Sequence, residues 1–259
     1  MPTALVTGAS SGIGREFADL LASDGYDLVL LARSEETLRE LGERLQADDG
    51  VTVTVVVKDL TDPDAPRATA DALAERGITV DVLVNNAGFG THGPFVESDL
   101  DRELDEIRVN VTALTELTRR FLPGMVDRGT GAVLNVASTA AFQPGPFMAV
   151  YYATKAYVLH FSEALSEEVA GTGVTVTALC PGPTDTGFQS RADVADTVLF
   201  QRGVMDARTV ARAGYRGMKQ GKAVVVPGFK NRLLAFLVRF LPRSTVRKTA
   251  MRLQEPNRQ

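Results

Sequence analysis

The sequence contains a single cysteine among its 259 residues and no long apolar run. That cysteine, Cys180, cannot form a disulfide within the chain, so we expect a reducing compartment, the cytoplasm. No uninterrupted apolar run reaches the roughly 18 residues that a membrane-spanning helix needs, and the N-terminus has no charged-then-apolar signal segment. These absences argue against a disulfide-stabilised or membrane-spanning protein and predict a soluble one.

A net positive charge is absent as well. The formal charge is −4 at pH 7, which argues against a general nucleic-acid binder. We expect neither a nucleic-acid partner nor a metal ion. Hydrophobic residues make up 44% of the chain and charged residues 23%, which is ordinary for globular proteins, and the length suits one α/β domain.

What the sequence does contain, at its start, is a glycine-rich loop that reads Thr-Gly-Ala-Ser-Ser-Gly-Ile-Gly over residues 7–14. Thr3 to Val6 before it are β-prone, and Phe17 and Leu21 after it recur at helical spacing. The glycines permit a sharp turn and close approach to an anion, and the helix N-terminus supplies free N–H groups. The loop therefore predicts a pyrophosphate site, with a purely structural turn as the alternative. The residues expected to contact a dinucleotide here are Gly8, Ser10, Ser11, Gly12, Ile13 and Gly14.

Strand and helix patterns alternate along the whole chain. The expected strands are Thr3–Val6, Asp27–Ala32, Val51–Val57, Val82–Asn85, Ala132–Ala137, Val174–Cys180 and Ala223–Val226. Their continuous apolar character is typical of parallel strands that are buried on both faces. We predict an α/β fold: a doubly wound (Rossmann) parallel seven-stranded sheet with helices on both faces, in a single domain. Residues 1–228 would form the dinucleotide-binding catalytic part, and residues 229–259 a basic, apolar, helical C-terminal extension of it.

Arg33 stands at the carboxyl end of the second expected strand. A dinucleotide-binding fold places an acidic residue about there when the ribose 2′-hydroxyl is free, and a basic one when it is phosphorylated. Arg33, helped by Ser10 and Ser34, can bind such a phosphate, which favours NADP(H) over NAD; a solvated surface arginine is the alternative. Asp59, after the third strand, can accept a hydrogen bond from the adenine amino group, or serve as a turn or capping residue.

Tyr151 and Lys155 are four residues apart in an expected helix from about Ala149 to Val169, so they project from one face. A nearby ammonium favours the phenolate and lowers a tyrosine pKa from its usual value of about 10. Ser138 ends the fifth strand and can orient a carbonyl group. Together these residues predict an acid/base site for the interconversion of carbonyl and alcohol. For the pair alone, a core tyrosine and a surface lysine are the alternative.

In order and spacing, these motifs resemble those of the short-chain dehydrogenase/reductase family over about residues 3 to 190. The matching pieces are residues 7–14, Asp59, the Asn-Asn-Ala-Gly of 85–88, Asn110, Ser138, Tyr151 with Lys155, and residues 181–186. The resemblance implies that Tyr151 is the acid/base and that Ser138 positions the carbonyl. Lys155 would hold the nicotinamide ribose, and Asn110 would support a proton-relay water by kinking its helix.

The resemblance also extends the set of cofactor contacts. Those that it adds are Leu60, Asn86, Ala87, Gly88, Pro181, Gly182, Thr184 and Thr186.

Tyr152 stands where many relatives have a small residue. The spacing from Ser138 and the four-residue step to Lys155 still identify Tyr151, and not Tyr152, as the acid/base residue. His92, in a glycine-rich loop, is expected to be solvated, with substrate contact as the alternative. The apolar residues where the family carries a substrate lid are Phe188, Val194, Val198, Leu199 and Phe200; helix core explains them equally well.

The C-terminal segment differs in charge from the rest of the chain. Residues 222–259 carry nine basic residues and one acidic residue, Glu255, which leaves 19 basic and 31 acidic before them. Apolar residues from Leu233 to Leu241 alternate there with Arg232, Arg239 and Arg243. Such a segment can rest on an anionic membrane surface, cap the cleft and attract an acyl carrier, or pack as an ordinary structural helix.

We therefore expect an NADPH-dependent reductase that converts a ketone to a secondary alcohol, on an apolar or acyl-chain-like small-molecule substrate. The alternatives are a catalytically silent NADP-binding sensor or scaffold, and an NADP-dependent alcohol dehydrogenase working in the oxidative direction. We also expect a homodimer or homotetramer formed through apolar residues that two long expected helices, near residues 99–121 and 149–169, direct outward. The candidates are Leu114, Leu117, Phe121, Tyr157, Phe161 and Leu165.

Overall fold

The computed structural model describes residues 1–188, 192 and 204–254 of the chain. Four of the five residues suggested for a substrate lid, Val194, Val198, Leu199 and Phe200, lie outside the described residues. The remaining one, Phe188, is described and packs beside Tyr151.

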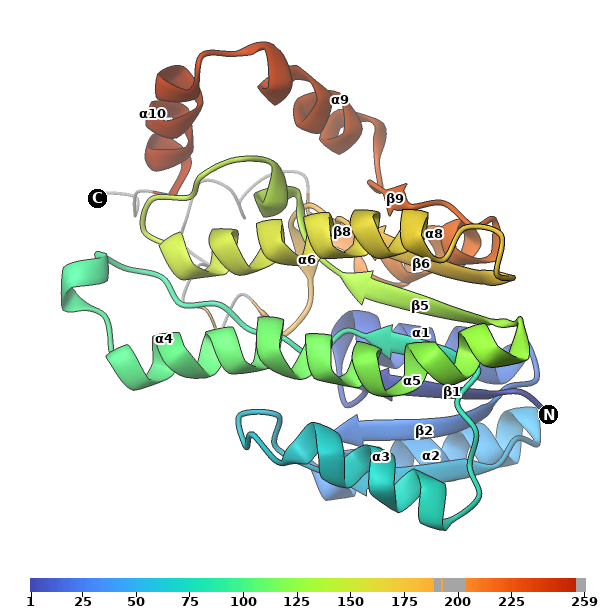
Figure 1. Cartoon of the computed structure of the whole chain (residues 1–259). Helices are drawn as coiled ribbons and strands as arrows, with labels where there is room; N and C mark the ends of the chain where they lie inside the picture. Colours follow the sequence, from blue (N-terminus) through green and yellow to red (C-terminus); the bar gives the residue numbers. More distant parts are fainter. Residues whose placement is uncertain (189–191, 193–203, 255–259) are drawn as a thin grey trace.

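A seven-stranded parallel sheet forms the centre of the molecule (Figure 1). In spatial order its strands are β3 (Val53–Val57), β2 (Asp27–Ala32), β1 (Thr3–Thr7), β4 (Val82–Asn85), β5 (Gly131–Val136), β6 (Val174–Leu179) and β9 (Val224–Val225). The chain moves outward from β1 in one direction through β2 and β3, then returns to build β4 to β9 on the other side. The predicted doubly wound sheet of seven strands is confirmed. Two short strands that the sequence did not suggest, β7 (Thr184–Asp185) and β8 (Met205–Asp206), form a separate pair.

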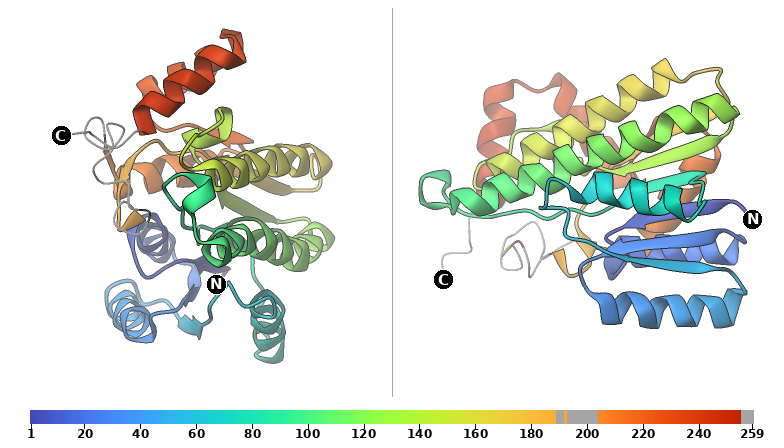
Figure 2. Two further views of the ribbon diagram at one scale, coloured as in Figure 1. Left: turned by 90° about the vertical axis from the view of Figure 1, so that its left-hand side faces the viewer. Right: turned by 60° about the horizontal axis from the view of Figure 1, so that its bottom comes forward.

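Both faces of the sheet are covered by helices (Figure 2). One face carries α1 (Gly12–Ser23), α2 (Glu35–Asp49) and α8 (Ala207–Lys219). The other carries α3 (Ala65–Glu75), α5 (Leu114–Arg128) and α6 (Ala149–Glu168). Side chains alternate along each strand, so Val6 points into the first layer and its neighbour Leu5 into the second. Both positions must be apolar, which is why the strands read as continuous apolar runs.

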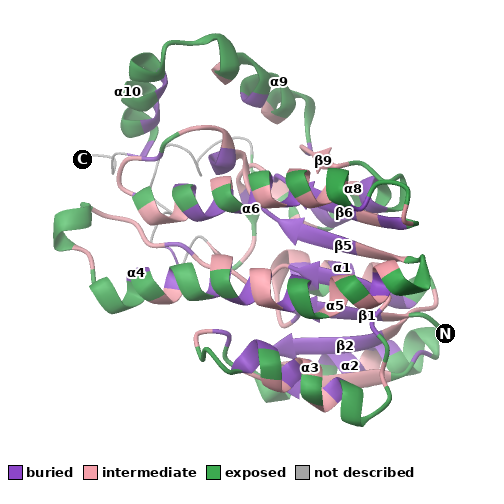
Figure 3. Ribbon diagram, in the orientation of Figure 1, coloured by how far each residue is buried: buried purple, intermediate pink, exposed green. Residues whose placement is uncertain are grey.

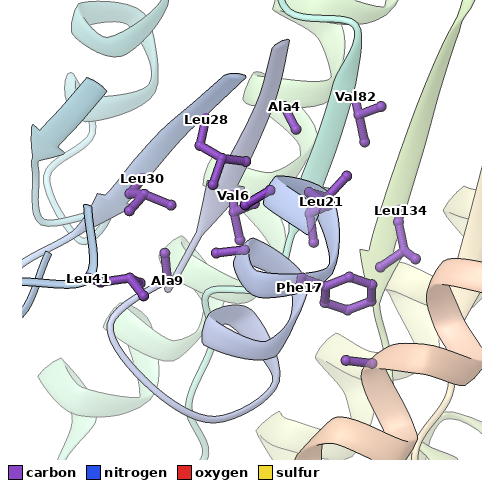
Figure 4. Close-up of a cluster of buried hydrophobic side chains, with 14 of the residues drawn as sticks. Ala4, Val6, Ala9, Phe17, Leu21, Leu28, Leu30, Leu41, Val82 and Leu134 are labelled. Atoms are coloured by element: carbon purple, nitrogen blue, oxygen red, sulfur yellow. The ribbon is translucent and has the colours of Figure 1, made fainter. Parts of the chain in front are cut away.

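Phe17 of α1 is the largest fully buried side chain of the first layer (Figure 4). It packs among residues of β1, β5 and α8 in one apolar cluster. A Cβ atom on Gly214 of α8 would lie 2.9 Å from the ring of Phe17 and 2.7 Å from Leu179, so glycine lets α8 approach α1 and the sheet closely. This packing fixes α1, and with it the glycine loop that precedes α1.

The long helix expected from about Asp99 is interrupted. It consists of α4 (Leu100–Ile107), a π-helical turn (Arg108–Ala113) and α5. Asp99 caps the start of α4, because its carboxylate accepts a hydrogen bond from the N–H of Asp101 at 3.0 Å. The π-helical turn contains Asn110, and such turns often occur at functional sites.

The predicted outward apolar face of the two long helices is partly wrong. Leu114 and Leu117 are 5% and 1% exposed and pack in the core, because the π-helical turn precedes α5 and these positions then face the sheet and α6. Tyr157 is 40% exposed, and its ring stacks on that of Phe161 with centroids 5.5 Å apart. The outward surface therefore centres on Tyr157 and Phe161.

The C-terminal segment forms an arm on the outside of the layered body (Figure 1). It consists of α9 (Phe229–Leu237), a 3-10 turn (Val238–Phe240) and α10 (Arg243–Gln254). The arm runs from β9 toward the side of the sheet at which the strands end, and most of its residues are exposed (Figure 3). Among the described residues, no helix is both long and apolar enough to cross a membrane.

Candidate active site

A cleft of about 1100 Å³ lies beyond the carboxyl ends of the strands. The predicted site residues that line it are Gly8, Ser10, Ser11, Gly12, Ile13, Arg33, Asp59, Leu60, Asn86, Ala87, Gly88, Ser138, Tyr151, Lys155, Pro181, Gly182, Thr184 and Thr186. Apart from Tyr151 and Lys155 on α6, each group directly follows a strand from β1 to β6, since parallel strands all end at one edge of the sheet. Two predicted residues, Gly14 and Asn110, lie behind the lining instead.

The glycine loop is held close to the loop that follows β4. Gly8 has φ of +64°, and a Cβ atom there would lie 2.8 Å from the side-chain nitrogen of Asn86. A Cβ atom on Gly14 would lie 2.4 Å from the same nitrogen. Asn86 donates hydrogen bonds to the carbonyls of Thr7 at 3.0 Å and Gly8 at 3.2 Å. The side-chain amide of Asn86 therefore stabilises this loop. Gly14 allows Asn86 to pack against the loop and does not line the cleft itself.

The start of α1 has the properties of an anion site. Ser11, its N-cap, makes no side-chain capping hydrogen bond, and the first turn of α1 contains no acidic residue. The first N–H groups of a helix have no intrahelical partner and carry the positive end of the helix dipole. With Gly12 at φ of +55°, the backbone turns so that these groups border the cleft. The geometry fits a diphosphate group at this helix end.

Arg33 and Asp59 meet at the edge of the cleft. Arg33 Nη1 lies 3.6 Å from Asp59 Oδ2, and both side chains are substantially exposed. Asp59 Oδ1 also accepts hydrogen bonds from the N–H and the hydroxyl of Thr61, so part of its role is to form a turn. The pKa of Asp59 is lowered by its hydrogen bonds with Thr61 and by Arg33, which outweigh the opposing effect of burial. Ser10, Ser34 and Lys58 also border this part of the cleft.

Tyr151 lies on the cleft side of α6, between two other aromatic rings. Its ring centroid is 5.2 Å from that of Phe188 and 6.1 Å from that of Tyr152. Burial raises the pKa of Tyr151 above its ordinary value, and a hydrogen bond with Ser138 opposes that rise. The expected lowering of the Tyr151 pKa by Lys155 is wrong here. Burial destabilises the phenolate of Tyr151 by more than the hydrogen bond with Ser138 stabilises it. The neutral phenol, which can donate a proton, is therefore the favoured form.

Lys155 is buried beneath Tyr151 rather than exposed on the surface. The side chain is 5% exposed, its Nζ donates a hydrogen bond of 2.8 Å to the carbonyl of Val136, and Nζ lies 5.7 Å from the centroid of the Tyr151 ring. Burial lowers the pKa of Lys155 to about 8, and the negative charge of Glu106 opposes this. The surface-lysine alternative is therefore wrong.

Asn110 projects from the π-helical turn toward the loop after β4. Its Oδ1 accepts a hydrogen bond from the N–H of Phe89 at 3.1 Å, and its Nδ2 donates to the carbonyl of Phe89 at 2.8 Å and to Thr154 Oγ1 at 3.1 Å. A Cβ atom on Gly88 would lie 2.8 Å from Asn110 Oδ1 and 3.4 Å from Lys155 Nζ. Glycine at position 88 therefore allows Asn110 and Lys155 to approach the cleft from behind.

Glu106 is a buried carboxylate that the sequence analysis missed. It lies one helical turn before Asn110 and is 0% exposed. Its Oε2 accepts a hydrogen bond of 2.9 Å from the hydroxyl of Thr91, and its Oε1 has no partner among the described residues. Burial raises the pKa of Glu106 to about 7, with Glu103 adding to the rise and Lys155 opposing it. The four-residue step to Asn110 was the available signal, but a glutamate in a charged helix is ordinarily exposed.

The end of the arm also reaches the cleft, which was one of the alternatives considered for the C-terminal segment. Gln254 is 1% exposed and lines the cleft. Its side chain donates a hydrogen bond of 2.7 Å to the hydroxyl of Tyr152. His92 Nε2 lies 2.9 Å from the carbonyl oxygen of Gln254, and since a carbonyl only accepts, this nitrogen carries the proton. His92, which also lines the cleft, is thus not simply solvated.

A cleft at the strand ends that brings a glycine loop together with a half-buried tyrosine and serine and a buried lysine fits a dinucleotide-dependent oxidoreductase. A family model described as "short chain dehydrogenase" matches residues 2–196, and the chain belongs to this family. The prediction that the protein is an enzyme of this family is confirmed. Among the described residues, no cluster of three His, Cys, Asp or Glu side chains is arranged to hold a metal ion.

Three known proteins illustrate the similarity. A very-long-chain 3-oxoacyl-CoA reductase of Bos taurus is 37% identical over 182 residues, 69% of this chain and 58% of that protein. The chain thus spans less than two thirds of the length of that relative. A putative ketoacyl reductase of Streptomyces coelicolor is 41% identical over 189 residues, 71% of this chain and 70% of that one. A short-chain dehydrogenase from Sphingobium yanoikuyae, solved in complex with NADPH, is 35% identical, with a TM-score of 0.83 over 93% of this chain and 94% of that one.

Proposed function

We propose that the protein is an NADPH-dependent carbonyl reductase that converts a ketone to a secondary alcohol. The observation that carries the proposal is the position of Tyr151, whose protonated phenol interacts with Ser138 above the buried Lys155 in the cleft. This arrangement suits a proton donor to a carbonyl oxygen. The glycine loop, the uncapped start of α1 and the size of the cleft supply room and binding groups for a dinucleotide.

The residues present fit NADP(H). Gly8, Gly12 and the N–H groups at the start of α1 would hold the diphosphate. Arg33 would bind the 2′-phosphate as a fork of N–H donors, and no acidic residue follows β2 directly. Asp59 is near enough to hold Arg33 in place. The complex of the Sphingobium yanoikuyae dehydrogenase with NADPH supports this choice.

The chain's own residues would act on the substrate in a fixed order. When bound, NADPH supplies the hydride that reaches the carbonyl carbon. Ser138 orients the carbonyl oxygen by donating a hydrogen bond, and Tyr151 gives its phenolic proton to that oxygen. The hydride on carbon and the proton on oxygen together make the alcohol. Lys155, held at the carbonyl of Val136, would bind the nicotinamide ribose and stabilise the transient phenolate. Asn110 would support a proton-relay water through the kink that its π-helical turn gives the helix.

The favoured direction is reduction. A neutral Tyr151 is ready to donate a proton, whereas oxidation of an alcohol requires the phenolate as a base, which burial disfavours. Oxidation remains the second candidate at alkaline pH, where the phenolate becomes accessible. A silent NADP-binding sensor is not supported by any particular contact, because such a protein has no need of the Ser138, Tyr151 and Lys155 set.

The proposed substrate class is a 3-oxoacyl thioester or another ketone with an apolar body. The substrate end of the cleft is lined by Phe89, Met148, Tyr152 and Phe188, which offer apolar surface beside Tyr151. The names of the Bos taurus and Streptomyces coelicolor relatives support an oxoacyl substrate. The basic C-terminal segment suits contact with a membrane or with an acyl carrier.

We further propose a homodimer or homotetramer in the cytoplasm. The exposed surface around Tyr157 and Phe161 on α6 is the proposed contact between copies. The one cysteine, Cys180, is buried, and burial raises the pKa of its thiol to about 12, so it suits a reducing compartment as an inert core residue.

The proposal is tested by NADPH oxidation with purified protein and a panel of ketones. The panel contains 3-oxoacyl thioesters of short and long chain, bulky apolar ketones and small polar ketones. We expect turnover with the apolar members and loss of turnover in the Tyr151→Phe variant. NADPH binding without oxidation of any ketone, and without reduction of NADP by the matching alcohols, would instead identify a sensor.

A further inference from the structure

The arm, residues 229–254, is attached to the body at both of its ends. Near its start, a Cβ atom on Gly182 would lie 2.5 Å from the side-chain nitrogen of Asn231, and that nitrogen donates to the carbonyl of Pro227 at 3.0 Å. At its end, Gln254 bonds to Tyr152. Gly182, Tyr152 and Gln254 all line the cleft, so the arm connects two points on the border of the cleft.

One narrow stripe of α9 faces the body. Asn231, Ala235 and Val238 recur at steps of four and three and are the part-buried or buried residues of α9 and the 3-10 turn. At 3.6 residues per turn, the opposite side of the helix carries Phe229, Leu233, Phe236, Leu237 and Phe240. These side chains are 73%, 44%, 55%, 43% and 71% exposed. A row of large apolar side chains therefore points away from the protein.

The rings of Phe236 and Phe240 contact each other on this exposed side, with centroids 5.0 Å apart. Isolated exposed apolar residues are normal on protein surfaces, but a contiguous row marks a surface that something else covers. The two phenylalanines join the helical and 3-10 parts of the arm into one apolar face. The arm packs few of its own apolar side chains against the body, so structural support for the fold does not account for this face.

Basic residues flank the apolar face. Between Phe229 and Gln254 the chain has seven basic residues and no acidic one. They are Lys230, Arg232, Arg239, Arg243, Arg247, Lys248 and Arg252. Arg232 and Arg239 border the apolar row on one side of α9, and Lys230 borders it on the other. No ion pair between described residues includes any of the seven, so their charges are available to an anionic surface.

We propose that the arm docks on an anionic lipid bilayer, with its apolar face at the boundary between headgroups and acyl chains. An amphipathic helix with aromatic and leucine residues on one side and flanking Lys and Arg binds such surfaces through apolar burial and electrostatic attraction together. A second copy of the chain fits poorly, because a two-fold contact through this face would set the flanking charges of Lys230, Arg232 and Arg239 against the same charges of the other copy. An acidic carrier protein would satisfy the charges but does not need the apolar row.

Docking in this way brings the border of the cleft close to the bilayer. On the proposed function, which this consequence assumes, the substrate is an apolar ketone that enters from the lipid phase near Gly182 and Tyr152. The docking itself assumes nothing about the reaction. A failure of vesicle binding would therefore contradict the docking and not the proposed reaction, and a failure of NADPH oxidation would contradict the reaction and not the docking.

The test is co-sedimentation of the full chain with phosphatidylcholine vesicles that contain about 30 mol% phosphatidylglycerol, beside vesicles of phosphatidylcholine alone. We expect binding to the anionic vesicles that falls at least about tenfold when the salt is raised from about 0.05 M to about 0.5 M. Phe236→Glu with Phe240→Glu should lose at least about tenfold in binding, and Arg239→Gln with Arg243→Gln should weaken it while retaining some. Val96→Glu, a matched change at a 90% exposed valine outside the arm, should bind as the wild type does.

Three results would overturn the proposal: no sedimentation with anionic vesicles at low salt, equal binding to both kinds of vesicle, or wild-type binding by the double phenylalanine variant. Light scattering tests the competing occupant. If the double phenylalanine variant is a smaller oligomer than the wild type and neither protein binds vesicles, the apolar face is a contact between copies. All of these variants change exposed side chains, and unchanged thermal unfolding will show that they fold.

Discussion

The side-chain amide of Gln254 donates a hydrogen bond of 2.7 Å to the hydroxyl of Tyr152, the residue next to Tyr151. This contact joins the last described residue of the chain to the helix that carries the proposed acid. His92 adds a second bond, to the backbone carbonyl of Gln254, so the end of the arm is fixed to two different parts of the cleft border. The hydroxyl of Tyr152 is thereby used in holding the arm, whereas that of Tyr151 interacts with Ser138.

The different partners of the two tyrosines lead to the first prediction. Tyr151→Phe removes the proton donor and should lower turnover by at least about 100-fold, the usual contribution of general acid/base catalysis, with NADPH affinity largely retained. Tyr152→Phe is the matched control and should keep most of the turnover. Single-turnover NADPH oxidation and equilibrium NADPH binding measure the two effects. An active Tyr151→Phe beside an inactive Tyr152→Phe would reverse the assignment.

The second prediction concerns the arm's attachment. Gln254→Ala removes this hydrogen bond while Gln143 still bonds to the hydroxyl of Tyr152, so it should lower the free energy of unfolding by about 1 kcal/mol. Gln220→Ala, at an exposed glutamine, should change it by less than about 0.5 kcal/mol. Denaturant titration of both variants measures the difference. Equal stabilities would mean that the contact between Gln254 and Tyr152 does not hold the arm.

The third prediction concerns cofactor choice. Arg33→Asp puts a carboxylate at the proposed 2′-phosphate site, so NADPH affinity should fall by at least about tenfold, since a charge-assisted bond is lost and a like charge is added. NADH affinity should be unchanged or higher. Arg39→Asp, the same charge change six residues further along the chain and inside α2, is the control and should leave both affinities nearly unchanged. A wild type that binds NADH as tightly as NADPH would contradict the role of Arg33.

The fold and the cleft lining were predictable because both depend on local patterns. Continuous apolar runs specify strands that are buried on both faces, and polar or glycine residues directly after those strands must gather at one edge of the sheet. Gly8 and Ser138 were found in this way, whereas Gly182 was added by the resemblance to the family. The four-residue step from Tyr151 to Lys155 likewise placed two side chains together without knowledge of the tertiary structure.

The remaining contacts depend on packing between distant segments. Gln254 and Tyr152 are 102 residues apart in the sequence, and no periodicity pairs them. Leu114 and Leu117 were assigned to the outer face because the sequence does not reveal the π-helical turn before them. Glu106 received no role from the sequence, because a glutamate in a charged helix is ordinarily exposed and nothing local indicates its burial. Its burial follows from the way α4 packs against α6 and the loop at Thr91.

Glu106 provides the last prediction, because its folded-state pKa lies near neutrality. The groups that face it are Glu103 on α4, Lys155 on α6 and the hydroxyl of Thr91. Its pKa rises from 4.5 to about 7 in the folded protein, so between these values the folded state binds more protons than the unfolded state. Stability from this group is therefore present at low pH and is lost as the pH rises through 7. Lys155, with its pKa lowered to about 8, acts in a separate and more alkaline window and in the opposite direction.

Replacing Glu106 by glutamine removes the ionisation and keeps a carbonyl oxygen for the hydroxyl of Thr91. The difference in unfolding free energy between Glu106→Gln and the wild type should therefore shift in favour of the variant by about 3 kcal/mol from about pH 5 to about pH 8, at roughly 1.4 kcal/mol for each unit of pKa. Denaturant titrations at both pH values measure this shift, and Glu167→Gln, at an exposed glutamate of α6, is the control that should show none. A variant whose stability relative to the wild type is the same at both pH values would show that Glu106 does not titrate in this range. It would then be ionised throughout this range in the folded protein, as it is in the unfolded chain, because Lys155 compensates its charge.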